Sequence, residues 1–286
     1  MLSKSKFILG QQCAKSFWLD LNNVPPTNEE DDAAKDRLRA GDEVGEIAKD
    51  IFPGGKEVPY LIGNHKEMFE ITKDLIKEGT TTIYEASFIY DDIFVRVDLM
   101  NKTDKGWDIY EVKSSTKIKN YHEYDASIQW HVLKELKLFT LNDVFIVTLN
   151  NQYEKEENII PLKYFTIDPI TNIANEKKNE VKDKILELKN ISNFDKEPLV
   201  DIGSHCKKPH SCVYLDKCWP ESMNDVDSIF RLYRLPLKKK LDFYNKGIDR
   251  FENIKDVSSL TETQQNQFKA YQTQSPVIDK KKLDDF

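Results

Sequence analysis

The stretch DIYEVKSST (residues 108–116) combines the pattern of a buried strand with two charged side chains. Its β-branched and aromatic residues favour a strand, and its charges, Glu111 and Lys113, are two residues apart. Side chains at that spacing lie on the same face of a sheet. The pair therefore either makes an ordinary ion pair at the surface or belongs to a reactive site.

Two further strand-like stretches precede this one, and together they predict an antiparallel meander. The strands are expected at 81–90, 93–100 and 107–115, separated by a two-residue turn and an Asn/Asp/Gly-containing loop. The periodicity that follows predicts a helix at 121–136 and a buried strand at 143–149. This order predicts an α/β fold with a mixed central sheet flanked by helices.

The remaining segments extend this core at both ends. An N-terminal helix over residues 1–20 is expected to be capped by Ser3 or Ser5, and the other predicted elements are helices at 32–51, 65–78 and 170–190 and a strand near 162–167. The tail from residue 222 is predicted to be helical, with a capping box at Ser259-Leu-Thr-Glu262. We expect one domain over 1–220 and a helical C-terminal extension over 221–286.

Length and charge limit the kind of protein. With 286 residues, of which 39% are hydrophobic, the chain can bury the core of one large domain or two smaller ones. No run of about 18 apolar residues and no secretory signal occur, so we expect a cytoplasmic protein without a membrane span. The net charge of −7 excludes a uniformly basic surface, so any phosphate-binding surface is local. Residues 201–250 are the basic segment, although a solvated helix face is the commoner explanation.

Asp98, near the end of the second predicted strand, adds a second carboxylate to the pair on the third. If these strands pair through the loop at 101–106, Asp98 and Glu111 can share a cation, with Lys113 one step further along. Phosphodiester hydrolysis uses this combination, because two carboxylates hold a hard divalent ion and a lysine orients water or offsets negative charge. Cross-strand ion pairs, each worth roughly 0.2–1 kcal/mol, are the commoner explanation of the spacing alone.

The order of three motifs resembles the signature of the PD-(D/E)XK nuclease superfamily, in its RecB-like branch. The motifs are VRVD (95–98), EVK (111–113) and the glutamine Gln129 in a following helix. The resemblance implies a restriction-endonuclease-like core and an Mg²⁺- or Mn²⁺-dependent deoxyribonuclease. Asp98, Glu111 and the Val112 carbonyl would bind the ion, Lys113 would position the attacking water, and Gln129 would orient Lys113 or the phosphate. The expected substrate is single-stranded or frayed DNA.

Three further positions bear on this resemblance. Glu85 matches an acidic residue that often precedes the motif in RecB-like members, although it equally fits an exposed strand position. The segment RAGDEVGEIA (39–48) resembles the first helix of the family, but Gly45 stands where a histidine ligand is usual. This departure leaves Glu46 as a substitute metal ligand, with a solvated helix face as the alternative. His131 is expected to have a packing or surface role and not a catalytic one.

The cysteines predict a metal centre. Cys206, Cys212 and Cys218 lie within thirteen residues, and Cys13 is far upstream. Without an export signal, four cysteines favour metal binding over disulfides. Zinc is an alternative, with His205 or His210 as ligands, but structural zinc sites usually use closer pairs. RecB-like nucleases of the CRISPR-associated type carry a [4Fe-4S] cluster bound by one upstream and three C-terminal cysteines, and the resemblance implies the same structural cluster here.

Two other functions remain open at this stage. The first is a catalytically inactive nucleic-acid- or protein-binding module of the same fold, and the second is a zinc-stapled interaction module without a nucleic-acid role. The chain also resembles the N-terminal part of longer, uncharacterised bacterial proteins. Protein partners in CRISPR adaptation or DNA repair are compatible with this resemblance.

Overall fold

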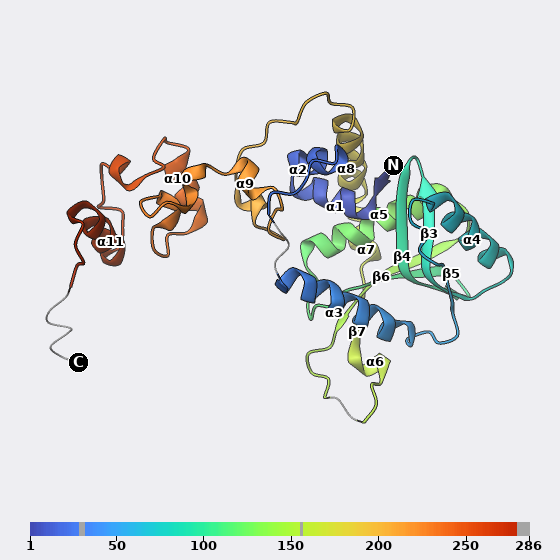
Figure 1. Ribbon diagram of the computed structural model, residues 1–286. Coiled ribbons are helices and arrows are strands. Elements are labelled where there is room, and N and C mark those ends of the chain that lie inside the picture. The colour runs from blue at the N-terminus through green and yellow to red at the C-terminus, as the bar shows by residue number, and fades with distance from the viewer. Residues whose placement is uncertain (29–31, 155–156, 279–286) are drawn as a thin grey trace. The chain divides into compact units, whose positions relative to one another are not determined.

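The structure is a computed structural model that describes residues 1–28, 32–154 and 157–278 (Figure 1). The chain divides into two compact units. Unit 1 comprises Met1–Val24 and Glu30–Leu199, and unit 2 comprises Pro25–Glu29 and Val200–Phe286. Residues 200–220, which we expected to belong to the first domain, are thus part of unit 2. In the described part of the chain, no helix is long and apolar enough to cross a membrane.

A seven-stranded mixed sheet forms the centre of unit 1. Its strands are β1 (Leu2–Ser3), β2 (Lys56–Glu57), β3 (Thr82–Tyr90), β4 (Ile93–Thr103), β5 (Gly106–Val112), β6 (Leu141–Leu149) and β7 (Phe165–Pro169). They follow the order β2-β3-β4-β5-β6-β7, and β1 pairs with β4 beside this path. The neighbours β3–β4, β4–β5 and β6–β7 are antiparallel, whereas β5–β6 is parallel. The predicted α/β class with a mixed sheet is confirmed.

Helices connect and cover these strands. Those of unit 1 are α1 (Lys4–Gln12), α2 (Ala14–Leu21), α3 (Asp32–Lys49), α4 (His65–Lys77), α5 (Asn120–Leu136), α6 (Pro161–Tyr164), α7 (Thr171–Glu176) and α8 (Lys178–Ile191). α5 provides the crossover that the parallel pair β5–β6 requires. The predicted helices at 32–51, 65–78 and 121–136 are confirmed.

The N-terminal segment differs from its prediction. The single helix expected over residues 1–20 is wrong, because β1 comes first and the helix breaks at Cys13, whose backbone is extended with φ −159°. Ser3 does cap α1, accepting a hydrogen bond from the Lys6 amide. The helix expected over 170–190 is likewise two helices, α7 and α8.

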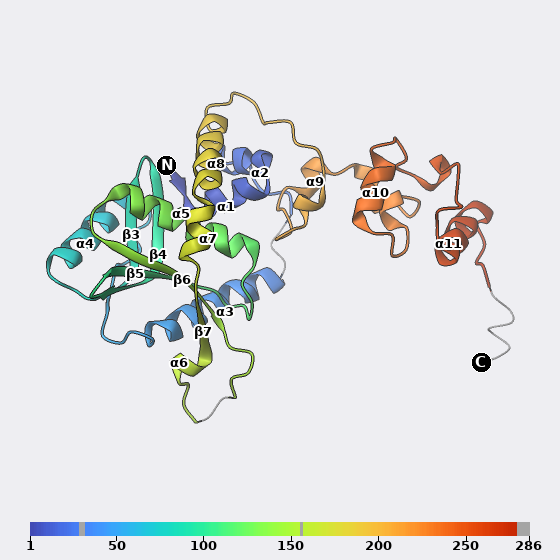
Figure 2. The same cartoon turned by 180° about the vertical axis from the view of Figure 1, so that it is seen from behind.

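Two layers of helices enclose the sheet. On one face α3 packs its apolar stripe against a row that crosses three strands, and the packed side chains are Val44, Ala48, Ile51, Tyr84, Leu99 and Tyr110. The larger core includes side chains of α1, α5 and α8, and Figure 2 shows α5, α7 and α8 beside one another. Gly10 allows α1 to approach α8 closely, because a Cβ atom there would lie 2.4 Å from Leu188 Cδ2. This close packing fixes α1 against the sheet.

β4 changes its neighbour along its length, and this change opens a split in the sheet. β5 pairs with β4 only as far as Leu99, which lies opposite Tyr110. Further toward its start, β4 pairs with β1 instead, at Ile93 and Phe94. Among the described residues, no strand pairs with residues 95–98 on that side of β4. Polar side chains have to satisfy the backbone groups that the split exposes.

Unit 2 consists of short helices around a core of its own. Its elements are α9 (Leu215–Cys218), α10 (Leu237–Tyr244), α11 (Glu262–Thr273) and 3-10 turns at Ser204–Cys206, Glu221–Asn224, Ile229–Arg231 and Phe251–Asn253. The capping box predicted at Ser259–Glu262 is wrong, because Thr261 and Gln264 form the box of α11. Leu260, which is buried in the core of unit 2, anchors the chain just before this cap.

Candidate active site

Asp98 and Glu111 lie next to each other on β4 and β5, on the same face of the sheet. The last paired residues of these strands are Leu99 and Tyr110, and the two acids occupy the next position on each strand. Because side chains alternate, both acids point away from the face that Leu99 and Tyr110 present to α3. Asp98 Oδ2 accepts a hydrogen bond of 2.7 Å from the Val112 amide. The Asp98 side chain thus replaces a backbone partner at the split.

Glu111 is a buried carboxylate with three side-chain donors. Only 2% of the residue is exposed. Its oxygens accept hydrogen bonds of 3.0 Å from Lys4 Nζ, 2.5 Å from Lys113 Nζ and 2.5 Å from Gln129 Nε2. Charge-assisted bonds of this kind compensate for the loss of water around a buried anion. The structure therefore brings Glu111, Lys113 and Gln129 together, and Gln129 contacts Glu111, whereas the resemblance implied that it would orient Lys113 or the phosphate.

α5 contributes a second acid that the sequence analysis did not identify. Asp125 lies four residues before Gln129 and therefore on the same side of the helix. Its carboxylate bonds to Lys113 Nζ, and its backbone carbonyl accepts a hydrogen bond of 3.1 Å from Gln129 Nε2. The spacing of Asp125 and Gln129 is the signal that could have identified it.

Lys4, at the start of α1, is the other unforeseen member of the cluster. Its ammonium group donates to Glu111, lies 3.8 Å from Asp125 Oδ1 and donates at 3.4 Å to the Arg96 carbonyl, which is exposed by the split. β1 pairs with β4 and ends at Ser3, so the next residue, Lys4, lies beside the split. Lys4 is 107 residues from Glu111 in the sequence, and no local pattern marks it.

Burial and mutual charge govern the electrostatics of the cluster. Burial raises the pKa of Asp98 to about 8, and the charge of Glu111 adds to the effect. Burial acts in the same direction on Glu111, but Lys113 and Lys4 outweigh it and hold the pKa of Glu111 well below its usual range. Burial opposes the charge of both lysines, yet Asp125 and Glu111 raise their pKa values. Lys113 and Lys4 thus favour the ionised form of Glu111, whereas burial favours the protonated form of Asp98.

Glu85 lies beside Asp98 on β3, where Tyr84 and Ala86 on either side pair with β4. Its backbone has φ 56°, which is unusual for a residue with a side chain and costs free energy of order 1–3 kcal/mol. Its carboxylate lies 3.0 Å from Arg96 Nε. Burial raises the pKa of Glu85, and Arg96 opposes this shift. Glu85 is thus adjacent to Asp98 and Glu111, but its carboxylate forms an ion pair with Arg96.

Glu46 lies on α3, which covers the opposite face of the sheet. Its side chain is 72% exposed and forms an ion pair of 2.7 Å with Lys49, which also pairs with Glu57 at 2.7 Å. In this arrangement Glu46 matches the solvated helix face that was the alternative to a metal ligand. His131 is buried on α5, in keeping with packing.

The donors near the split suit a hard cation by chemical type. Asp98, Glu111 and the Val112 carbonyl offer oxygen atoms, which Mg²⁺ and Mn²⁺ prefer. Among the residues that the structure describes, however, no three His, Cys, Asp or Glu side chains form a ready-made metal-binding group. Lys4 and Lys113 instead contact Glu111. Cation binding here requires deprotonation of Asp98 and a loosening of these ammonium contacts.

The cysteine sulfurs accept backbone hydrogen bonds. Cys13, in unit 1, accepts from the Ser16 amide at 3.5 Å. In unit 2, Cys206 Sγ accepts from Gly203 at 3.4 Å and Cys212 Sγ accepts from Tyr214 at 3.4 Å. Cysteine sulfur is a ligand of both zinc and iron–sulfur clusters. By residue type, these cysteines therefore fit a sulfur-bound metal.

Comparison with known proteins adds little. No protein-family model and no curated protein match the chain. One similar solved structure, titled "Crystal structure of SSO0001", has a TM-score of 0.27 and 12% identity, over 75% of this chain and 96% of that chain. A likeness this weak defines neither a fold family nor a function.

Proposed function

We propose that unit 1 is a metal-dependent deoxyribonuclease of the RecB-like PD-(D/E)XK type. The observation that carries the proposal is the position of Asp98 and Glu111 one step beyond the last pair of β4 and β5, with Lys113 bonded to Glu111. These are the acid pair and the amine that hydrolysis of a phosphodiester requires. Gln129, buried on α5, supports the same carboxylate.

The side chains have distinct roles in this proposal. Asp98 and Glu111 would hold Mg²⁺ or Mn²⁺, with the Val112 carbonyl as a further ligand. The ion supplies Lewis acidity and lowers the pKa of a bound water. Lys113 would place positive charge where negative charge develops on the phosphate, and Asp125 keeps its ammonium group in position. Gln129 fixes Glu111, and Lys4 balances its charge in the absence of the cation.

The cysteines are proposed to hold a structural [4Fe-4S] cluster, with Cys13, Cys206, Cys212 and Cys218 as ligands. The support for this proposal is the residue type and number, because four cysteines complete the ligand set of such a cluster. Four thiolates also suit zinc, so metal analysis of the purified protein distinguishes the two. Such a metal would stabilise the protein by coupling binding to folding.

A binding-only module of the same fold is the second candidate. The observation in its favour is Lys4, whose ammonium group contacts both oxygens of Glu111 at 3.1 and 3.0 Å. If this contact persists in the presence of metal, the protein binds DNA or a partner without cutting it.

Cleavage of end-labelled single-stranded DNA in Mn²⁺ tests the proposed activity. Asp98→Asn and Lys113→Ala should abolish cutting, since they remove a metal ligand and the positive charge at the phosphate. Asp104→Asn and Lys105→Ala are matched controls, because both residues are exposed in the turn between β4 and β5 and should retain activity. Cutting by the Asp98→Asn protein, or its absence from the wild type with added Mg²⁺ or Mn²⁺, would refute the proposal.

A further inference from the structure

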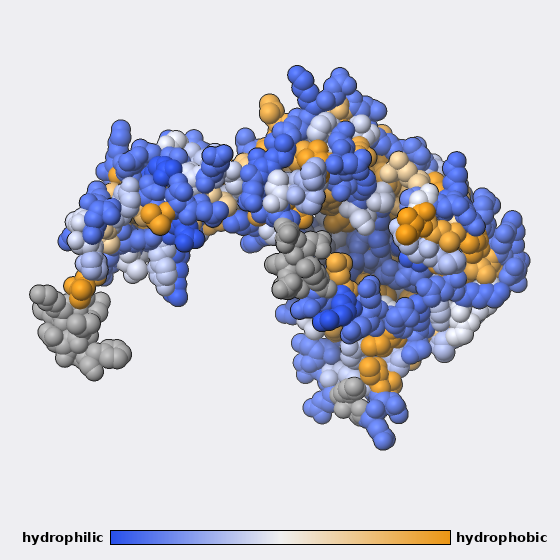
Figure 3. Space-filling model, viewed as in Figure 1, coloured by the Kyte–Doolittle hydropathy of each residue, from blue (hydrophilic) through white to orange (hydrophobic). Residues whose placement is uncertain are grey.

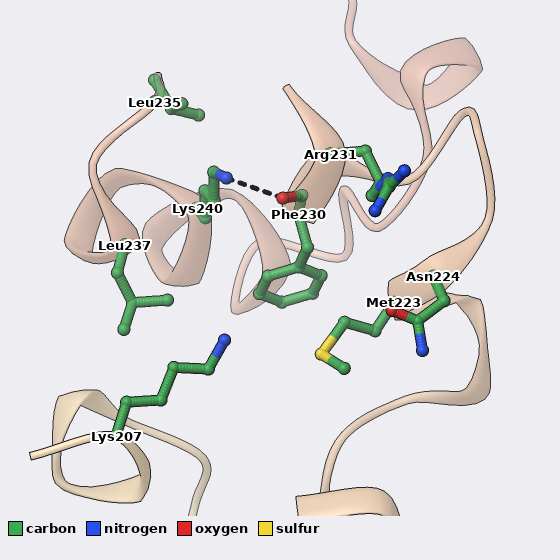
Figure 4. Close-up of a pocket in the computed structure, with 8 residues that line it drawn as sticks. All are labelled: Lys207, Met223, Asn224, Phe230, Arg231, Leu235, Leu237 and Lys240. Atoms are coloured by element: carbon green, nitrogen blue, oxygen red, sulfur yellow. Dashed lines mark hydrogen bonds between the residues drawn. The ribbon is translucent and has the colours of Figure 1, made fainter. Parts of the chain in front are cut away.

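Unit 2 contains a groove that the proposed hydrolysis does not use. Three cavities of about 340, 410 and 400 Å³ adjoin one another, because the first two share Phe230, Arg231 and Lys240, and the last two share Arg231, Tyr233 and Gln267. We refer to these three adjoining cavities together as the groove, which lies along the segment that precedes α10 and along α11. Figure 4 shows the first cavity, with the Phe230 ring at its centre and Lys207 Nζ pointing toward that ring.

The groove is lined by cations and by no acid. Lys207, Arg231, Arg234 and Lys240 line it, whereas its described lining includes neither aspartate nor glutamate. This composition is unexpected in a chain whose net charge is −7. Figure 3 shows hydrophilic side chains over most of unit 2 on the face drawn. A local concentration of positive charge of this kind attracts anions.

These cations also lack counter-ions. Among the described residues, no carboxylate forms an ion pair with Lys207, Arg231 or Lys240. Lys240 Nζ donates to the Phe230 carbonyl at 2.6 Å. Burial lowers the pKa of Lys240, and the charges of Lys207 and Arg231 lower it further. An anion in the groove would offset this repulsion.

The groove also presents groups that suit nucleobases. Tyr233 is 48% exposed, and the Arg234 guanidinium lies 5.1 Å from the centre of its ring. The Gln267 side chain accepts from the Tyr233 amide at 2.7 Å and donates to the Arg231 carbonyl at 3.2 Å, so this part of the groove is fixed. Exposed aromatic rings beside a basic groove are typical of single-strand binding.

We propose that this groove binds single-stranded DNA, with Lys207, Arg231 and Lys240 at successive phosphates and Tyr233 stacked on a base. Several cations along three adjoining cavities fit a chain of phosphates better than a single phosphorylated small molecule. The choice of DNA rests on the proposed nuclease function, but binding in the groove needs no metal and no cleavage.

The test measures binding without hydrolysis. Fluorescence anisotropy of a labelled 20-residue oligothymidylate in EDTA is compared for wild type, Lys207→Ala/Arg231→Ala and the control Lys238→Ala/Lys239→Ala. The residues of both pairs are exposed, and Lys239 lines a separate cavity that contains Asp242. Loss of two phosphate contacts should weaken binding about tenfold and make the slope of log K against log salt shallower by about 1.4. Tyr233→Ala should weaken binding without changing the slope.

Each outcome separates the groove from the active site. Equal binding by the two double variants, or no binding by the wild type, would refute DNA binding in the groove. Displacement of the oligonucleotide by thymidine monophosphate at a similar concentration overturns it as well, because the site would then take a small phosphorylated ligand. If Lys207→Ala/Arg231→Ala weakens binding but the wild type shows no Mn²⁺-dependent cutting, DNA binding in the groove is supported and the proposed nuclease activity is refuted.

Discussion

Replacing Lys4 by methionine tests the charge cluster at the strand split. The substitution keeps the length and apolar volume of the side chain and removes the ammonium group. In the structure that group donates to both oxygens of Glu111, at 3.1 and 3.0 Å, and to the Arg96 carbonyl at 3.4 Å. The variant therefore leaves a buried carboxylate with two donors instead of three.

The expected loss of stability follows from burial. Removing one partner of a buried ion pair costs about 3–5 kcal/mol. The Lys4 side chain is 20% exposed and Glu111 keeps Lys113 and Gln129, so we expect a loss of about 2 kcal/mol in EDTA. For a unit of this size the melting temperature would fall by about 4–8 °C.

Metal should act differently on the variant. Without Lys4 the cluster carries one positive charge fewer, so a divalent cation binds it more favourably and competes with one ammonium group, that of Lys113, instead of two. Thermal unfolding followed by circular dichroism should therefore show a larger stabilisation by Mn²⁺ for Lys4→Met than for the wild type. Lys6→Met is the control, because Lys6 forms a partly exposed ion pair with Asp20 at 3.3 Å.

The reasoning fails if Lys4→Met unfolds at the same temperature as Lys6→Met in EDTA. It also fails if Mn²⁺ stabilises the variant no more than the wild type, since Glu111 would then not be a cation ligand.

Three further predictions concern other parts of the molecule. Gln129→Leu should lower the free energy of unfolding by about 1–3 kcal/mol in urea titrations, since it removes a buried donor to Glu111; an unchanged midpoint would contradict this. Burial tends to raise the pKa of Asp227, but Arg250 outweighs it and lowers this pKa. The stability that this pair contributes above about pH 4 should therefore be lost as the pH falls through the lowered pKa. Asp227→Asn should make the unfolding free energy less dependent on acid pH. Cys206→Ser should reduce bound iron and absorbance near roughly 400 nm, whereas stoichiometric zinc in a colourless wild type would exclude the cluster.

Local signals in the sequence predicted the central sheet well. Strands expected at 81–90, 93–100 and 143–149 coincide with β3, β4 and β6, because alternation and short turns are properties of adjacent residues. The break at Cys13 was not predictable in this way, since the surrounding residues 11–16 (QQCAKS) contain neither proline nor glycine. The backbone there changes direction because α1 and α2 pack against each other as separate helices.

The candidate site was only partly accessible from the sequence. Asp98, Glu111 and Lys113 lie within sixteen residues, and their register follows from one short loop. Lys4 reaches them only because β1 pairs with β4, a long-range contact that no local pattern encodes. Asp125 was overlooked because an acid on a helix has many ordinary explanations. The structure supplies the missing partners of the buried charges.

The split in the sheet explains why these charges gather where they do. β4 pairs with β5 only from Leu99 onward, so the residues just before Leu99 leave the Arg96 carbonyl and the Val112 amide without a strand partner, and buried backbone groups without partners are costly. Lys4 donates to the carbonyl and Asp98 accepts from the amide, so one cation and one acid serve as partners of the exposed backbone groups. Once they are present, Glu111 can be buried only with further donors, which Lys113 and Gln129 provide. The gathering of these charges is thus a consequence of how the strands separate, and a substitution that closed the split would disperse the cluster even with both acids retained.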